Sequence, residues 1–111
     1  LALTYPERKE NPAPALDLLS CKPLTFAEID ENTFDCFRLA KEAAKRGGTV
    51  CAAMNAANEE AVALFLQDKI GFYDISELVA RAMELPSIEK PKLRDILAAD
   101  KAARELVLSG R

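Results

Sequence analysis

The pattern of apolar and polar positions divides the chain into an irregular N-terminal stretch and a helical remainder. From about position 33 onward, apolar residues recur every third and fourth position, the spacing of one face of an α-helix. Residues 1–31 lack this spacing and carry four prolines: Pro6, Pro12, Pro14 and Pro23. Proline fixes its own φ and pushes the preceding residue toward extended geometry. The pattern predicts a connector over 1–31 and a C-terminal helical domain over 32–111.

Two local features stand out within the connector. The proline-rich stretch 11–15 predicts a stiff, polyproline-like linker. Further on, Leu24 and Phe26 alternate with Thr25 and Ala27, which predicts a short extended strand over 24–30. No obvious pairing partner for this strand exists within the chain, so the prediction is a lone strand.

The first half of the helical region predicts two helices, with an open question inside the second. Gly47 and Gly48 supply the left-handed stop that ends a first helix over 33–46. Thr49 is predicted to cap the next helical segment. That segment continues to about position 69, and Gly71, two residues later, is predicted to end it. Because asparagine side chains prefer to cap, those at positions 55 and 58 predict a break into a short piece and a main helix over 55–69.

The second half predicts two further helical stretches. Asp74 as N-cap and Glu77 three residues later resemble a capping box at the start of the third helix, and Pro86 stops it near position 85. The final stretch runs over 92–109, where Asp100 would share the apolar face. A buried carboxylate is costly, so we predict that Asp100 caps a second piece, giving helices over 93–98 and 101–108. The predicted fold is all-α, a small antiparallel, four-helix-like bundle with short loops.

Composition excludes several classes of function. The 111 residues include no histidine, which removes the commonest acid/base group near neutral pH and the commonest metal ligand. A net charge of −3, with both signs scattered, leaves no basic surface for nucleic acid or an anionic membrane. The longest apolar runs are too short to span a bilayer, and no signal peptide is recognisable. We therefore expect no nucleic-acid and no membrane partner, and the missing initiator methionine indicates a piece of a longer protein.

The three cysteines offer no disulfide framework and no metal site. Cys21, Cys36 and Cys51 lie far apart for a zinc knuckle, and an odd count leaves one thiol unpaired. We expect reduced thiols that serve as small buried apolar residues in a cytosol-like compartment.

One polar cluster, Asn55, Asn58, Glu59 and Glu60, interrupts the apolar sequence. On a helix, Asn55, Asn58 and Glu59 would share a face, and a metal or amide-binding site can be imagined there. Adjacent glutamates, however, diverge by about 100° on a helix, which disfavours a shared cation. The favoured interpretation is structural, with asparagines that cap the backbone and glutamates that complement the helix dipole.

The remaining charged runs also favour structural roles. Glu28, Asp30 and Glu31 precede the first helix, where negative charge complements the helix dipole, whereas Lys41, Lys45 and Arg46 near its far end look solvated. The glycines form no phosphate-binding loop of either nucleotide pattern. We predict no catalytic, cofactor-binding or metal-binding residue in this chain.

Specific strings carry a family resemblance along essentially the whole chain. They are LTYPER over 3–8, LTF over 24–26, MNAANEEAVALFL over 54–66, DILAAD over 95–100 and the pair Ala103-Arg104. In this order they resemble the C-terminal part of 1-deoxy-D-xylulose 5-phosphate reductoisomerases, enzymes of non-mevalonate isoprenoid biosynthesis.

The resemblance implies a longer parent with an NADPH-binding domain, a catalytic domain that holds a divalent cation such as Mg or Mn, a connector and a helical domain. That parent would convert 1-deoxy-D-xylulose 5-phosphate to 2-C-methyl-D-erythritol 4-phosphate, as a homodimer in the bacterial cytoplasm or the plastid stroma. This chain would be the connector and helical domain, with the family's functional residues upstream of Leu1. It would brace the catalytic domain, and alone it would expose its apolar face or self-associate.

Two other hypotheses remain open from the sequence. A stand-alone helical protein-interaction module would show the same periodicity. A carboxylate-only metal enzyme built on Glu59 and Glu60 would require the isolated chain to bind a divalent cation.

Overall fold

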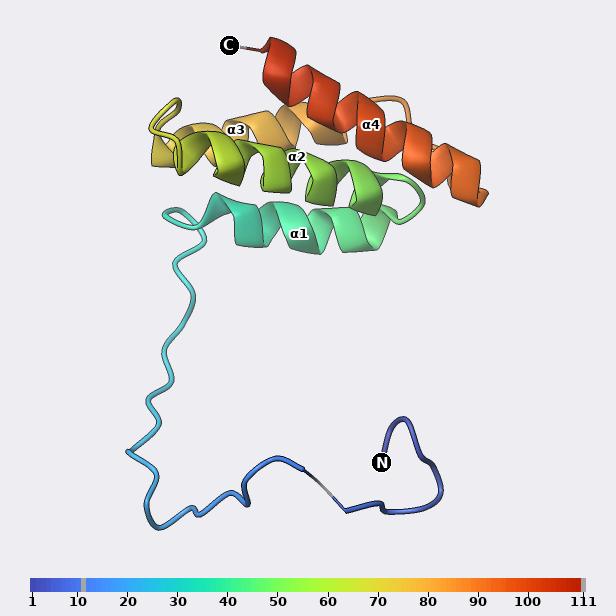
Figure 1. Cartoon of the computed structure of the whole chain (residues 1–111). Coiled ribbons are helices and arrows are strands. Elements are labelled where there is room, and N and C mark those ends of the chain that lie inside the picture. Colours follow the sequence, from blue (N-terminus) through green and yellow to red (C-terminus); the bar gives the residue numbers. More distant parts are fainter. Residues whose placement is uncertain (11, 111) are drawn as a thin grey trace.

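A computed structural model describes residues 1–10 and 12–110, and within them the only regular elements are four α-helices. These are α1 (Asp35–Arg46), α2 (Val50–Phe65), α3 (Phe72–Met83) and α4 (Leu93–Ser109). Consecutive helices run antiparallel, with α4 tilted across the others (Figure 1). The predicted all-α fold is confirmed. Position 11 of the predicted stiff linker and position 111 of the predicted bundle lie outside the described residues.

The second helix, α2, is the centre of the fold. It packs against α1, α3 and α4, whereas α1 and α4 make no contact with each other anywhere in the described chain. Its buried positions are mostly alanines, namely Ala53, Ala56, Ala57 and Ala61. Small side chains bring helix axes close together, so neighbouring helices can cover several sides of α2. The arrangement is therefore a layered bundle around α2 rather than a square of four equal helices.

The predicted breaks inside α2 and α4 are both wrong. Asn55 does not end α2, because its Nδ2 donates to Glu59 Oε1 one turn later, at 3.0 Å, instead of to the backbone. Asp100 does not split α4, because its carboxylate accepts from Arg104 Nε at 3.0 Å and stays at the edge of the core. In both helices a side-chain partner at i+4 satisfies the polar group and leaves the helix continuous.

The boundary between α2 and α3 also differs from the prediction. The second helix ends at Phe65, and the turn that follows places Asp68 in the left-handed region at φ 55°. Gly71 begins α3 as its N-cap instead of ending α2, and its N–H donates to Asp74 Oδ2 at 2.7 Å. The predicted cap, Asp74, thus acts from the third residue of the helix, where a carboxylate serves the N-terminal amides.

A close backbone approach pins the turn between α1 and α2 to the loop that precedes α4. As predicted, Gly47 ends α1 with positive φ, and Gly48 also has positive φ. Thr49 is the residue before α2, as predicted, but its side chain does not cap it. The Thr49 N–H donates to Ile88 O, and its Oγ1 accepts from the Ile88 N–H, both at 3.0 Å.

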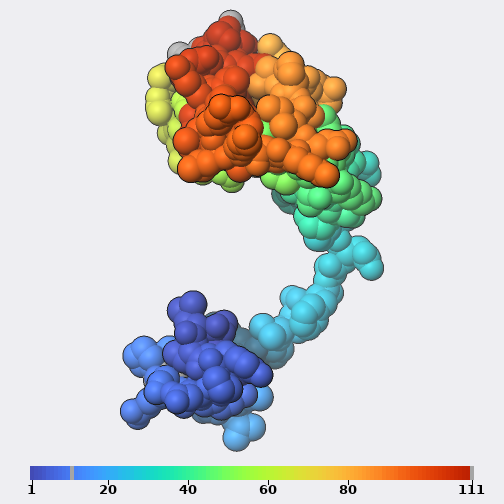
Figure 2. Space-filling view, turned by 90° about the vertical axis from the view of Figure 1, so that its right-hand side faces the viewer, coloured from blue at the N-terminus to red at the C-terminus, as the bar shows by residue number. Residues whose placement is uncertain are grey.

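The predicted strand over 24–30 is wrong, because no strand is present among the described residues. A strand needs a neighbour to take its backbone hydrogen bonds, and the connector runs away from the helices with none beside it (Figures 1 and 2). The connector's large apolar side chains are exposed instead. They are Leu1, Leu3, Tyr5, Leu16, Leu18, Leu19, Leu24, Phe26 and Ile29.

Candidate functional site

The polar cluster of α2 forms an ion-pair network with α4. Arg104 Nη2 donates to Glu59 Oε2 at 2.6 Å, and Arg104 Nε donates to Asp100 Oδ2 at 3.0 Å. Glu60 Oε2 lies 3.8 Å from Arg104 Nη1, and Asn55 completes the set through Glu59. One guanidinium therefore ties α4 to two consecutive residues of α2, Glu59 and Glu60.

The same contacts account for the electrostatics of the network. Hydrogen bonds to Asp100 and then to Glu59 raise the pKa of the Arg104 guanidinium. Donation from Arg104, followed by donation from Asn55, lowers the pKa of the Glu59 carboxyl below its ordinary value. A carboxylate stabilised as the anion by a neighbouring cation is a poor general base or acid near neutral pH. The arrangement is chemically suited to holding two helices together.

The structure separates Asn58 from the other members of the predicted cluster. Asn55 and Glu59 come together at α4, whereas Asn58 faces α1 and the start of α3. Within the residues that the structure describes, no group of three or more Cys, Asp or Glu side chains could hold a metal ion. The prediction that this chain carries no catalytic or ligand-binding residue stays a prediction.

The acidic run before α1 organises the entry into that helix. Asp30 accepts the backbone N–H groups of Asn32 and Thr33 and the Thr33 hydroxyl at 2.7 Å. The Thr33 hydroxyl is the main cause of the lowered pKa of Asp30. Glu31 pairs with Lys41 at 2.9 Å rather than acting on the helix dipole alone.

The basic residues near the end of α1 are more than solvated charges. Lys41, besides pairing with Glu31, lies 5.1 Å from the centre of the Phe37 ring. Arg46 donates to the Met83 carbonyl at 2.8 Å and pairs with Glu84, which joins the end of α1 to the end of α3. All three side chains are exposed, so the prediction that they are solvated is confirmed, and Lys41 and Arg46 form these specific contacts in addition.

All three cysteines are free, as predicted, but they are not all buried. Cys21 and Cys51 are exposed, and only Cys36 is half-buried. The Cys51 thiol donates to the Ala43 carbonyl at 3.3 Å. Burial, and then the charge of Asp35, raises the pKa of the Cys36 thiol. A raised pKa lowers the thiolate fraction, so Cys36 is a poor nucleophile.

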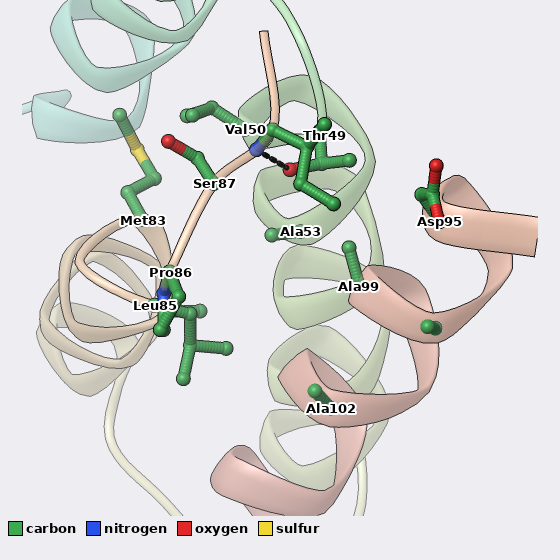
Figure 3. Close-up of a pocket in the computed structure, with 13 residues that line it drawn as sticks. Thr49, Val50, Ala53, Met83, Leu85, Pro86, Ser87, Asp95, Ala99 and Ala102 are labelled. Atoms are coloured by element: carbon green, nitrogen blue, oxygen red, sulfur yellow. Dashed lines mark hydrogen bonds between the residues drawn. The ribbon is translucent and has the colours of Figure 1, made fainter. Parts of the chain in front are cut away.

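Two hollows lie between the helices, and periodicity alone could not have located either. The first, of about 290 Å³, lies between α2, the loop before α4 and α4 itself. Ala99 and Ala102 of α4 lie across it from Ala53 of α2, and Met83 and Leu85 close one side (Figure 3). Its lining is almost entirely apolar, with Asp95 as the one carboxylate.

The second hollow, of about 210 Å³, lies between the starts of α1 and α3, and we call it the aromatic groove. Its lining includes Phe34, Cys36, Val62, Phe72 and Tyr73. Phe72 makes edge-to-face contacts with Phe65 and Tyr73, at ring-centre distances of 6.0 and 5.5 Å. Neither hollow presents a set of polar groups arranged for catalysis.

The described helices all fall short of the length and apolar character that crossing a membrane requires.

Comparisons with known proteins agree with the resemblance seen in the sequence. Residues 1–106 match the family model described as the DXP reductoisomerase C-terminal domain. The 1-deoxy-D-xylulose 5-phosphate reductoisomerase of Ruminiclostridium cellulolyticum is 47% identical, in an alignment that covers 97% of this chain and 30% of that protein. The enzyme from a Cyanothece strain is 44% identical, covering 96% of this chain and 28% of that protein.

Solved structures give the same result. The reductoisomerase from Zymomonas mobilis in complex with NADPH matches with a TM-score of 0.83 and 40% identity, over 96% of this chain and 29% of that one. A reductoisomerase in complex with magnesium matches with a TM-score of 0.78 and 35% identity, over 98% of this chain and 30% of that one. The chain thus spans about 30% of the length of these relatives. It belongs to the DXP reductoisomerase C-terminal domain family.

Proposed function

We propose that this chain is the connector and C-terminal helical domain of an NADPH- and divalent-metal-dependent reductoisomerase that converts 1-deoxy-D-xylulose 5-phosphate to 2-C-methyl-D-erythritol 4-phosphate. The observation that carries the proposal is the match of nearly the whole chain to about 30% of such enzymes. In this proposal residues 1–31 are the connector and 32–111 the helical domain. The parent acts as a homodimer in the cytoplasm or the plastid stroma.

The residues of this chain do not fit the enzyme's cofactors. NADPH binding would require a glycine-rich phosphate loop, but Gly47 and Gly48 form a tight turn and Gly71 caps α3. A metal site would require convergent carboxylates, but Glu59 and Glu60 are both paired with Arg104. The proposal therefore assigns cofactor and metal binding to the part of the parent that precedes Leu1 and gives this chain a supporting role.

The exposed connector supports that role. Leu19 and Phe26 leave more than 90% of their surface in solvent. Apolar side chains gain free energy when they leave water, so a continuous segment with many of them favours contact with another surface. In the proposal that surface is the catalytic domain, which the connector follows while the helical domain braces the substrate cleft.

A chimera tests the proposal directly. The matching C-terminal region of the Ruminiclostridium cellulolyticum reductoisomerase is replaced by this chain, and oxidation of NADPH is followed with 1-deoxy-D-xylulose 5-phosphate as substrate. We expect kcat/KM within roughly tenfold of the natural relative. We also expect a loss of at least about a hundredfold when the region is deleted.

Two controls decide the outcome. The deletion variant shows whether the region is needed at all, and circular dichroism shows whether the chimera is folded. A folded chimera that is as inactive as the deletion variant would contradict the proposal and favour an independent interaction module.

A further inference from the structure

The aromatic groove exposes more aromatic surface than the helical fold itself requires. Phe34, Phe72 and Tyr73 remain half-exposed or more, although each lies beside buried core residues. The groove's lining includes one charged residue, Asp35. Enrichment in aromatic side chains with depletion of charge is typical of the buried centre of protein interfaces. The composition of the groove thus favours contact with another protein surface.

A second exposed apolar patch, at the start of α4, has a different character. Leu93, Ile96 and Leu97 are exposed there. Lys92 and Arg94 flank Leu93 in the sequence, and Arg94 Nε lies 3.4 Å from Asp95 Oδ1. Cations among the apolar side chains raise the desolvation cost of covering this surface, because each charge needs a partner or water. This patch is a weaker candidate for a dry interface than the aromatic groove.

The position of the groove indicates what covers it. The connector joins the helices at Phe34, which itself lines the groove, at the end of the bundle where α1 and α3 begin (Figure 1). Most of the length of the relatives lies outside this chain. The family is the C-terminal domain, so that remainder lies on the N-terminal side and reaches the helices through the connector.

We propose that the aromatic groove is the docking surface for the part of the parent chain that precedes Leu1. This inference rests on the proposed function and adds to it the face of the helical domain that makes the contact. Tyr73, Phe72 and Phe34 supply the rigid apolar contacts, while the exposed start of α4 points away from the interface. The docked surface is expected to present apolar side chains to the groove.

A matched pair of substitutions in the chimera tests this assignment. Tyr73 and Leu93 are 64% and 71% exposed, and each lies in the first turn of its helix. A carboxylate in the first turn complements the helix dipole, so neither Tyr73→Asp nor Leu93→Asp should harm its own helix. We expect Tyr73→Asp to lower kcat/KM at least about tenfold and to lower the melting temperature, with Leu93→Asp close to the parent chimera. Equal effects of the two substitutions, or a larger effect of Leu93→Asp, would overturn the assignment.

Photo-crosslinking provides a readout that does not depend on activity. A benzophenone amino acid is placed at Ser76, which lines the groove, or at Arg94, at the start of α4. We expect the probe at position 76 to crosslink within the same chain to residues upstream of Leu1, with at most a tenth of that yield from position 94. Crosslinks from position 76 only to a second copy, or upstream crosslinks only from position 94, would overturn the proposal.

The two proposals can fail separately. The activity of the unsubstituted chimera tests the function, whereas crosslinking needs only a folded chimera and reports the contact even when that chimera is inactive. An active chimera with equal responses at positions 73 and 93 would retain the function and reject the groove.

Discussion

The connector and the helical region contain similar apolar residues, but the connector exposes them to solvent and the helical region buries them. Leu19 and Phe26 in the connector are almost fully exposed, whereas Val79 in α3 and Val107 in α4 are completely buried. The helical region supplies its own partners, because each of its helices packs against at least two others. The described part of the connector lies apart from the helices (Figure 2). Apolar sequence therefore shows that a surface needs covering, and only the neighbouring structure shows what covers it.

The largest predicted loss of stability distinguishes a buried helical position from an exposed connector position. Val79→Asp would place an unpaired carboxylate at a position with no exposed surface, and we expect it to destabilise the fold by more than about 4 kcal/mol. Leu19→Asp, at a side chain that is 98% exposed, should change the stability of this chain by less than about 0.5 kcal/mol. Urea unfolding followed by circular dichroism measures both. A connector variant as damaging as the core variant would show that the connector packs on the helices.

An intermediate effect should come from the place where two loops of the helical region meet. Gly48 has φ 58°, and a Cβ added there would lie 2.3 Å from the Ile88 carbonyl oxygen. Gly48→Ala should therefore destabilise the fold by about 2–3 kcal/mol, through backbone strain and the displaced loop. Gly71→Ala is the matched control, because its φ of −80° is ordinary and it should cost less than about 1 kcal/mol. Similar melting temperatures for the two variants would contradict the close approach.

The smallest effect should come from the polar link between α2 and α4, and it should depend on pH. The Glu59 pKa is lower in the folded chain than in the unfolded chain, so its contribution to stability is present above the ordinary pKa. It is lost as pH falls through the lowered folded value. Glu59→Gln should thus lower the melting temperature slightly at neutral pH and have less effect in acid.

The control for this link is Glu105→Gln, which removes only a surface pair with Lys101 at 3.7 Å. Exposed ion pairs contribute little, so we expect a smaller change than for Glu59→Gln at neutral pH. A Glu59→Gln effect that grows as pH falls would contradict the assigned role of Arg104.

Local sequence patterns predicted the helices well and their ends less well. The stop at Gly47 was predictable because a tight turn with positive φ favours glycine. The continuity of α2 was not, because it depends on whether Asn55 bonds to the backbone or to Glu59, and that choice is coupled to Arg104 forty-five residues away. The role of Gly71 was missed because Asp68, one of the few non-glycine residue types that adopt positive φ readily, makes the turn that glycine was expected to make.

The polar cluster and the aromatic groove also show which features the sequence could predict and which it could not. The sequence identified Asn55, Glu59 and Glu60 as an unusual group and favoured a structural role, but it did not contain the partner that explains them. Phe34 showed no signal as a partner of Phe72 and Tyr73, because it lies nearly forty residues before that adjacent pair. An exposed aromatic pair at the start of a predicted helix was the one available hint.

The sequence by itself determined the positions of the helices, the proline-rich connector and the family, because these depend on neighbouring residues and on the identity of short strings. Only the tertiary structure decided that α2 lies at the centre, that Arg104 joins it to α4, and that two helix starts form a groove beside the connector. The physical reason is the distance along the sequence between the groups that interact. Helix periodicity and caps are set by groups within about four residues. The packing of helices and the exposure of the connector depend on side chains tens of residues apart or outside this chain.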